Sequence, residues 1–216
     1  MNIKLKNQLI GIVHQYIDES DISHDFIHTQ LVLRNAEQIA KQEKADRDIV
    51  VAAALFHDII VYPKNSADTC KSQHDSAELA AKILKTIKEF PAVKIEAVKK
   101  CILECSFTQN LPPSSLESKV LQDADLLEST GAISIMRTFA SAALMKRRFF
   151  NIEDPFCKKR IVNNQKFATD LFFLRLLKAG QRIKTKTAKK IAVRRTKFLK
   201  QFLKELGKEI YEKFEN

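Results

Sequence analysis

The sequence predicts an all-α protein. Glycine and proline, the residues that most often interrupt helices, number only 4 and 5 among 216 residues. Long stretches repeat apolar residues at intervals of three and four, which is the period of an amphipathic helix, and no segment alternates as a half-buried strand does. Because no Pro/Gly/Ser-rich linker interrupts the chain, we expect one helical domain over residues 1–216, with a core at about 20–150 and C-terminal helices at about 160–214.

Three helices are expected in the first quarter of the chain. The first ends near residues 16–17 and is followed by a polar turn. The second runs over about 24–42, because its apolar residues keep the helical spacing. Asp46 or Asp48 is placed to cap a third helix, which contains the apolar run Val50–Phe56 and reads as buried.

A loop and two helices are expected in the middle of the chain. The loop covers 62–69 and is opened by Pro63. A helix over 73–90 keeps the spacing of three and four until Pro91 stops it, and another follows at 93–107.

Four more helices are expected in the C-terminal half. Ser114–Glu117 fits a capping box and starts the first of them. Gly131 precedes a helix over 132–150, and two further helices follow at about 164–178 and 187–214. In the last helix an i, i+4 stripe is expected to pack in the core: Phe198, Phe202, Leu206, Ile210 and Phe214.

Charge and composition narrow the function classes. The net charge of +11 fits an anionic partner, such as a nucleotide, a nucleic acid or an acidic membrane surface, and equally fits solvated Lys-rich helix faces. The first ten residues lack the apolar core of a signal peptide, and the four cysteines form no C-x-x-C pair, so we expect reduced thiols in a cytoplasmic protein. No apolar stretch reaches the ~20 residues that span a bilayer.

The absence of other motifs excludes several enzyme classes. The sequence contains no Gly-rich phosphate loop and no G-x-S-x-G elbow. Ten Lys or Arg residues lie between Arg182 and Lys204, with little aromatic interleaving. Base stacking is therefore not indicated, while non-specific contact of this basic C-terminal helix with nucleic-acid phosphates stays open.

Four side chains carry the strongest chemical signal: His28, His57, Asp58 and Asp125. Neutral imidazole and carboxylate are mixed nitrogen and oxygen ligands, which suit a divalent metal that activates water. They come from three expected helices, and helices of one bundle can converge on a single ion. Taken singly, each has a plainer interpretation as a core histidine, a helix-end cation or a surface acid, but the ordered set favours a metal site.

Further candidates surround these four. Glu128 shares a helix face with Asp125 and would orient a ligand or a water, or else belong to an exposed acidic patch. His24 lies one turn before the first ligand and fits either a base or a helix cap. Lys64 and Arg137 fit phosphate clamps and equally fit ordinary surface cations.

This set of residues resembles the HD superfamily of metal-dependent phosphohydrolases, in particular a small stand-alone bacterial group. The order H…HD…D is matched, and the family's longer motifs resemble HDFIH at 24–28, AALFHD at 53–58 and QDADLLESTGAISIMRTF at 122–139. Lys64-Asn65 and the C-terminal helices are also similar, so the resemblance covers nearly the whole chain.

The resemblance implies an HD-domain bundle that holds one divalent ion (Mn²⁺, Mg²⁺, Ni²⁺ or Fe²⁺) between its helices through the four residues above. It also implies hydrolysis of a phosphoester or phosphoanhydride, with a nucleotide as the leading substrate and a nucleoside triphosphate diphosphatase as the nearest activity. Asp58, His24 and Glu128 are then the expected catalytic residues, and Lys64 and Arg137 the expected substrate ligands.

Four positions depart from the group's usual pattern, which has Arg or His where this chain has Leu31, Cys105, Leu126 and Leu171. Residues of those types hold phosphates or protons. Two alternatives therefore stay open: a degenerate HD protein that binds metal and nucleotide with little turnover, and a nucleic-acid-associated basic helical protein.

Overall fold

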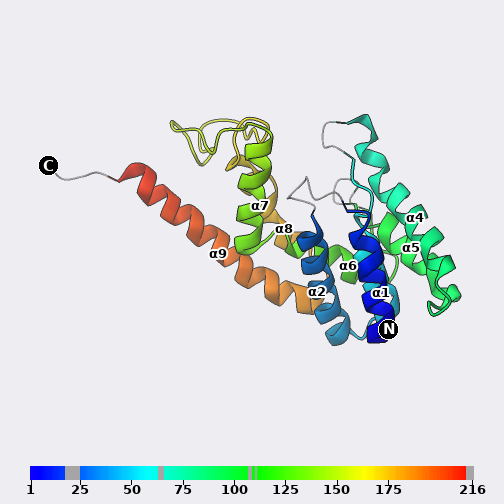
Figure 1. Ribbon diagram of the computed structural model, residues 1–216. Helices are drawn as coiled ribbons and strands as arrows, with labels where there is room; N and C mark the ends of the chain where they lie inside the picture. The colour runs from blue at the N-terminus through cyan, green and yellow to red at the C-terminus, as the bar shows by residue number, and fades with distance from the viewer. Residues whose placement is uncertain (18–24, 63–65, 107–108, 110, 213–216) are drawn as a thin grey trace. The chain divides into compact units, whose positions relative to one another are not determined.

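In the part of the chain that the computed structural model describes, helices make up the regular structure and loops connect them (Figure 1). The described residues are 1–17, 25–62, 66–106, 109 and 111–212. Within them no strand forms, and the β pairing consists of an isolated bridge between Arg148 and Phe167. The predicted all-α fold is confirmed. No helix of the described part is both long and apolar enough to cross a membrane.

The chain divides into two compact units. Unit 1 comprises Met1–Asp125 with Lys184–Ala188, and unit 2 comprises Leu126–Ile183 with Lys189–Asn216. The single domain expected from the sequence stays a prediction, and each unit is described by itself.

The described part of unit 1 contains six α-helices. They are α1 (Ile3–His14), α2 (Phe26–Glu43), α3 (Arg47–Phe56), α4 (Ser72–Thr86), α5 (Ile95–Leu103) and α6 (Leu116–Leu127), whose last two residues belong to unit 2. Helix α3 packs against α1, α2 and α5. Helix α5 packs along α4 (Figure 1). Two 3₁₀ turns, η1 (Ala67–Lys71) and η2 (Ala92–Lys94), precede α4 and α5.

Side-chain caps explain where α2 and α3 begin. The Asp25 carboxylate accepts the backbone N–H of His28 at 2.9 Å, which satisfies one of the unpaired donors of the first turn of α2. Of the two predicted caps of α3, Asp46 is the one used: it accepts the Asp48 N–H at 2.9 Å. The Lys94 ammonium lies 2.7 Å from a carboxylate oxygen of Asp46 and 2.7 Å from one of Asp48. These two ion pairs hold η2 against the start of α3.

The core of unit 1 confirms that α3 is a buried helix. Every residue of Val50–Phe56 is buried, and Phe56 is fully enclosed. Ile39 of α2, Leu84 of α4 and Ile102 of α5 are also fully enclosed. Each such side chain contributes about 1.5–3 kcal/mol through removal of apolar surface from water.

Helix α4 is shorter than predicted. It ends at Thr86 rather than Phe90, because Ile87 adopts an extended backbone (φ −98°, ψ 102°). This bend places both Ile87 and Phe90 in the core, with 5% and 4% of their surface exposed. The predicted loop at 62–69 also contains the beginning of η1.

Helix α6 starts where expected, but its cap differs from the predicted capping box. The Ser118 N–H donates to Ser115 Oγ at 3.0 Å. The capping residue is therefore Ser115, one residue after Ser114, which the capping box predicted. Glu117 Oε1 instead accepts the backbone N–H of Asp46 at 3.0 Å. The acidic residue of the predicted box therefore joins α6 to α3.

Unit 2 contains α7 (Gly131–Leu144), a π-helix η3 (Phe172–Leu176), α8 (Leu177–Arg182) and most of α9 (Lys186–Tyr211). Its core is the cluster of Phe172, Leu176 and Leu199, against which Phe202 packs. The rings of Phe172 and Phe202 stack with centroids 5.7 Å apart. The predicted core stripe of α9 is thus confirmed at Phe202. Phe198 is 45% exposed and is not a core residue, and Phe214 lies outside the described residues.

Two helices of unit 2 are shorter than predicted. Helix α7 ends at Leu144 instead of residue 150, because Lys146 takes a left-handed backbone (φ 53°) and Arg148 then pairs with the segment around Phe167. The helix predicted at 164–178 begins only near residue 170. Asp170 binds Arg160 through two contacts of 2.6 Å, which holds the preceding segment as a loop.

Candidate metal centre

His28 enters the site from the first turn of α2. Its side chain is 3% exposed, and the Asp25 cap fixes the turn that carries it. The Nε2 atom lies 3.6 Å from Asp58 Oδ2 and 3.7 Å from Asp125 Oδ1. This imidazole therefore faces both carboxylates of the predicted set.

His57 follows the last residue of α3 and keeps helical backbone angles (φ −61°, ψ −33°). Its Nδ1 lies 2.9 Å from the carbonyl oxygen of Ala54, one turn earlier. Since a carbonyl only accepts, Nδ1 carries the proton, and in the neutral ring Nε2 then has the lone pair. Nε2 is buried, makes no hydrogen bond with the described residues, and lies 3.5 Å from Asp58 Oδ2. A buried acceptor of this kind fits a metal ligand.

Asp125 completes the group from α6. Its side chain is 21% exposed, and Asp58 is 15% exposed, so both carboxylates retain some contact with solvent. Asn35, two turns after His28 on α2, donates its amide N–H to the Ala124 carbonyl at 3.4 Å. This buried hydrogen bond joins the two helices that carry His28 and Asp125.

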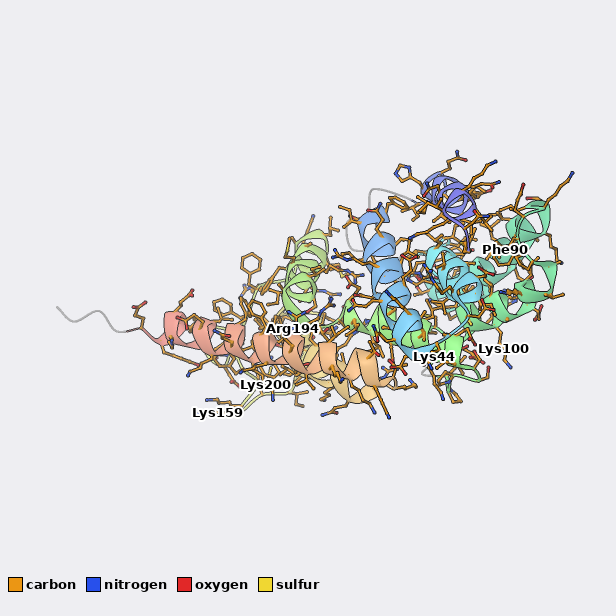
Figure 2. All side chains as sticks on the ribbon, turned by 90° about the horizontal axis from the view of Figure 1, so that it is seen from below. Lys44, Phe90, Lys100, Lys159, Arg194 and Lys200 are labelled. Atoms are coloured by element: carbon orange, nitrogen blue, oxygen red, sulfur yellow. The ribbon has the colours of Figure 1, made fainter. Side chains whose placement is uncertain are left out.

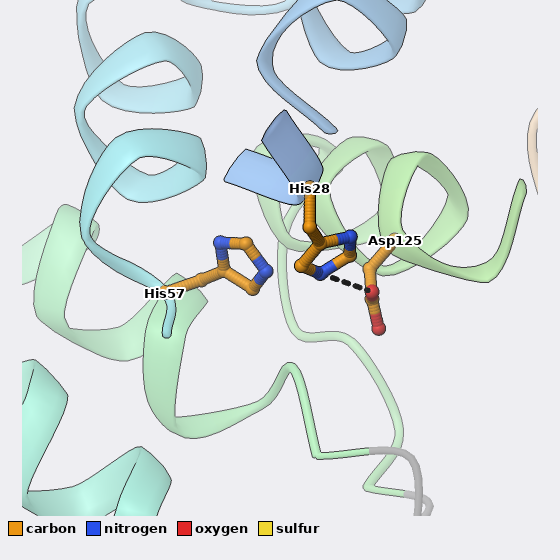
Figure 3. A group of neighbouring side chains, drawn as sticks. All are labelled: His28, His57 and Asp125. Atoms are coloured by element: carbon orange, nitrogen blue, oxygen red, sulfur yellow. Dashed lines mark ion pairs between the residues drawn. The ribbon is translucent and has the colours of Figure 1, made fainter. Parts of the chain in front are cut away.

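The residues present fit a divalent ion. One ligand atom each of His28, His57 and Asp125 lies within 4.8 Å of the others (Figure 3), and Asp58 Oδ2 approaches both imidazoles. Ligands placed about 2.1 Å from one ion are roughly 3.0 Å apart when adjacent and roughly 4.2 Å apart when opposite. The separations of 3.5–3.7 Å fall in this range. Two carboxylates and two imidazoles also form a mixed oxygen and nitrogen donor set.

Cys105 is buried in the same unit. Burial raises the pKa of its thiol well above the usual value, and the charges of Asp125 and Asp58 raise it further. The thiol is therefore protonated and neutral near pH 7. The resembling group usually has His at this position. This chain has a neutral thiol there, and two of the predicted ligands, Asp58 and Asp125, help to keep it protonated.

The other predicted site residues belong to unit 2 or lie outside the described residues. Glu128 is buried just after α6, with Oε1 3.6 Å from Arg195 Nη1 within unit 2. Arg137 is half-buried in α7. His24 and Lys64 lie outside the described residues. The roles assigned to these residues stay predictions.

The sequence did not indicate a role for Asp123. Its carboxylate is fully buried and accepts the backbone N–H groups of Lys184 at 2.9 Å and Thr185 at 2.6 Å. Burial raises the pKa of Asp123, and these N–H groups partly oppose that effect. The sequence feature that could have revealed this role is the apolar surroundings of Asp123, since Val120, Leu121 and Ala124 are its neighbours in α6. A carboxylate at a buried position needs hydrogen-bond partners.

Comparison with known proteins identifies an HD domain in this chain. The HD domain family matches residues 25–130, which include all four predicted ligands. The chain carries an HD domain. This match, together with a similar solved structure that is named an HD-superfamily hydrolase, confirms the predicted resemblance and, with it, the class of HD-type phosphohydrolases.

The HD domain and the C-terminal helices both have counterparts in related proteins. The uncharacterized protein YpgQ of Bacillus subtilis is 28% identical over 208 residues, which cover 96% of this chain and 95% of YpgQ. The crystal structure of YpgQ in complex with ADP has a TM-score of 0.74 at 27% identity and 97% coverage of both chains. An HD-superfamily hydrolase from Bacillus thuringiensis has a TM-score of 0.74 at 25% identity, with 97% and 98% coverage.

Proposed function

We propose that this protein is a phosphohydrolase that uses one divalent ion, held by His28, His57, Asp58 and Asp125, to hydrolyse a nucleotide. The observation that carries the proposal is the convergence of His28, His57 and Asp125 from α2, α3 and α6, with ligand atoms within 4.8 Å of one another. Residues far apart in the sequence meet at one place with the donor atoms that a divalent metal requires.

The chain's own residues prepare this site. The Ala54 carbonyl fixes the tautomer of His57, so the Nε2 lone pair needs no rearrangement before it binds an ion. Asp58 Oδ2 lies 3.6 Å and 3.5 Å from the two imidazoles and supplies negative charge. A divalent ion at this place supplies Lewis acidity, which lowers the pKa of water and neutralises charge on phosphoryl oxygens. The partial exposure of Asp58 and Asp125 leaves the carboxylate side open to solvent.

A nucleotide is the substrate class that we propose. Support comes from the ADP complex of YpgQ, whose fold matches over 97% of this chain. The finer proposal is release of pyrophosphate from a nucleoside triphosphate. Lys64 and Arg137 are then proposed to bind phosphate, and His24 or Glu128 to position the attacking water. Glu128 would have to do so while paired with Arg195.

Cys105 favours a second candidate function. A neutral thiol cannot replace the positive charge or the proton relay of a histidine near neutral pH. If the usual histidine contributes to turnover, this chain binds metal and nucleotide but hydrolyses the nucleotide slowly. The two candidate functions use the same metal site and differ in the rate of nucleotide hydrolysis.

A hydrolase screen separates these candidates. Wild-type protein is assayed with nucleoside mono-, di- and triphosphates in the presence of Mn²⁺, Mg²⁺, Ni²⁺ or Fe²⁺, and the phosphate and pyrophosphate released are measured. We expect metal-dependent release that Asp58→Ala removes. The matched control is Asp68→Asn, which changes a half-exposed carboxylate paired with Lys71 in η1 and should leave the rate unchanged.

The outcomes are distinct. Metal-dependent hydrolysis supports the phosphohydrolase. Nucleotide and metal binding without hydrolysis supports the second candidate. Full activity in Asp58→Ala, or hydrolysis that needs no metal, contradicts the proposed centre.

A further inference from the structure

The positive charge of this protein is concentrated in unit 2. Unit 2 contains 20 of the 37 Lys and Arg residues but only 8 of the 26 Asp and Glu residues, so its formal charge is +12 against −1 for unit 1. The four proposed metal ligands all belong to unit 1. The charge excess therefore belongs to a part of the chain that the metal centre does not explain, and such asymmetry is typical of proteins that bind polyanions.

Much of this charge lies on one face of α9, the basic face. The basic face consists of Lys189, Lys190, Arg194, Lys197, Lys200 and Lys204, all of them exposed. At 3.6 residues per turn these six side chains fall within an arc of roughly 140° and extend along roughly 22 Å of helix. Arg194 and Lys200 are labelled on this helix in Figure 2.

The opposite face of α9 is packed. Leu199 is fully buried, Ala192 is 2% exposed, and Phe202 stacks on Phe172. Packing on that side fixes the rotation of the helix, so the basic face points to solvent. No acidic residue occurs between Asp170 and Glu205 in the sequence, so α9 itself supplies no counter-charge along this length.

We propose that the basic face binds the phosphate backbone of duplex DNA without sequence specificity. A row of cations about 22 Å long spans about six base pairs at 3.4 Å each, and it can displace counterions from several phosphates. Between Lys189 and Lys204 the centre of the face carries one exposed apolar residue, Val193, and no aromatic residue on which bases could stack. Leu199, Phe202 and Leu203 of α9 are packed within unit 2, so these apolar side chains are not available to insert into a membrane.

The test compares two variants that change the net charge equally. In the face variant Lys190, Lys197 and Lys204 are replaced by Gln. In the control variant the exposed Lys85, Lys88 and Lys100 of unit 1 are replaced by Gln. Fluorescence anisotropy of a labelled duplex DNA of about 20 base pairs gives the association constant at several salt concentrations between about 50 and 200 mM.

We expect the wild type and the control variant to bind with steep salt dependence. The face variant should lose at least about tenfold in affinity at about 50 mM salt. Its slope of log K against log salt should be shallower by up to about 2.7, since each lost phosphate contact removes about 0.9. Because no proposed ligand is changed, metal binding should be the same in all three proteins.

Three results would overturn the proposal. The first is no binding of duplex DNA by the wild type at about 50 mM salt. The second is an equal loss in the face and control variants, which would show an effect of net charge alone. The third is tighter binding to single-stranded DNA or to phosphatidylserine vesicles than to the duplex, which would assign the basic face to another partner.

Discussion

The imidazole of His57 is oriented by the carbonyl oxygen of Ala54, which lies 2.9 Å from Nδ1. Ala54 belongs to the last turn of α3, a helix whose residues from Val50 to Phe56 are all buried. The proposed ligand atom Nε2 is thus held in place by the hydrophobic core through one hydrogen bond. This arrangement links burial of an apolar helix to the geometry of a proposed metal site.

Metal binding should stabilise the folded protein. An ion that binds only the folded state adds about 2.7 kcal/mol when its concentration is 100 times the dissociation constant. We expect the thermal midpoint of the wild type to rise with Mn²⁺ and to fall back when a chelator removes it. Asp125→Asn removes an anionic ligand and should abolish the rise.

The matched control for this prediction is Asp68→Asn, since Asp68 is half-exposed and pairs with Lys71. It should keep the full response to Mn²⁺. An equal Mn²⁺ response in wild type and Asp125→Asn would contradict a role for Asp125.

Asn35 should position the site without contacting the ion. Its amide joins α2 to the Ala124 carbonyl of α6. Asn35→Leu should cost about 1 kcal/mol of stability and weaken metal affinity by about 10–100-fold, as loss of groups that orient ligands does. Calorimetric titration with Mn²⁺ and urea unfolding measure the two effects.

Ser134 provides the comparison for Asn35. It is buried in α7 and donates to the Gly131 carbonyl at 2.7 Å. Ser134→Ala should lower stability by a similar amount but leave Mn²⁺ affinity unchanged. Equal Mn²⁺ affinity in Asn35→Leu and wild type would show that the α2–α6 hydrogen bond is only structural.

The Arg160–Asp170 pair should make unit 2 sensitive to acid. Burial raises the pKa of Asp170, but Arg160 and the Asn163 N–H outweigh it and hold this pKa below the usual value. A carboxyl with a lowered folded-state pKa contributes stability above its unfolded pKa of about 3.9. That contribution is lost as the pH falls through the lower folded value.

Arg160→Leu leaves the buried Asp170 carboxylate without its cation. We expect a loss of about 3 kcal/mol at pH 7, and a difference from wild type that shrinks below about pH 4 as Asp170 becomes protonated. Urea unfolding at pH 7, 5, 4 and 3 measures this. Arg160→Leu with Asp170→Asn should recover part of the loss, and a pH-independent difference would contradict the ionic origin.

Cys105 should be replaceable by alanine with little effect on rate, because the thiol is protonated near pH 7. Cys105→His restores the residue usual in the resembling group and should raise turnover or metal stoichiometry, although the larger side chain in a buried position costs about 1–3 kcal/mol. Hydrolysis rates and metal content of the three proteins are compared under the same conditions. A Cys105→Ala protein that loses metal or activity would show that the thiol itself is used.

Periodicity and residue order predicted the features that depend on local pattern. The buried helix α3 followed from one apolar run, and the convergence of His28, His57 and Asp125 was predicted from their order on three expected helices. For α3 the hydrophobic pattern fixes which way the side chains point.

The wrong or missing predictions depend on contacts between distant residues. Helix α4 stops at Thr86 because the core takes up Ile87 and Phe90, which no local signal reveals. The residues before 170 form a loop because Asp170 binds Arg160. The carboxylate of Asp123 accepts hydrogen bonds from the N–H groups of Lys184 and Thr185, which lie about sixty residues later in the chain.

The most direct test of the proposed metal centre is anomalous diffraction from crystals of the protein loaded with Mn²⁺. We expect one strong peak with ligand distances of roughly 2.0–2.3 Å to His28 Nε2, His57 Nε2 and carboxylate oxygens of Asp58 and Asp125. A peak elsewhere, or no peak with His57 and Asp125 too far apart to share an ion, would contradict the account.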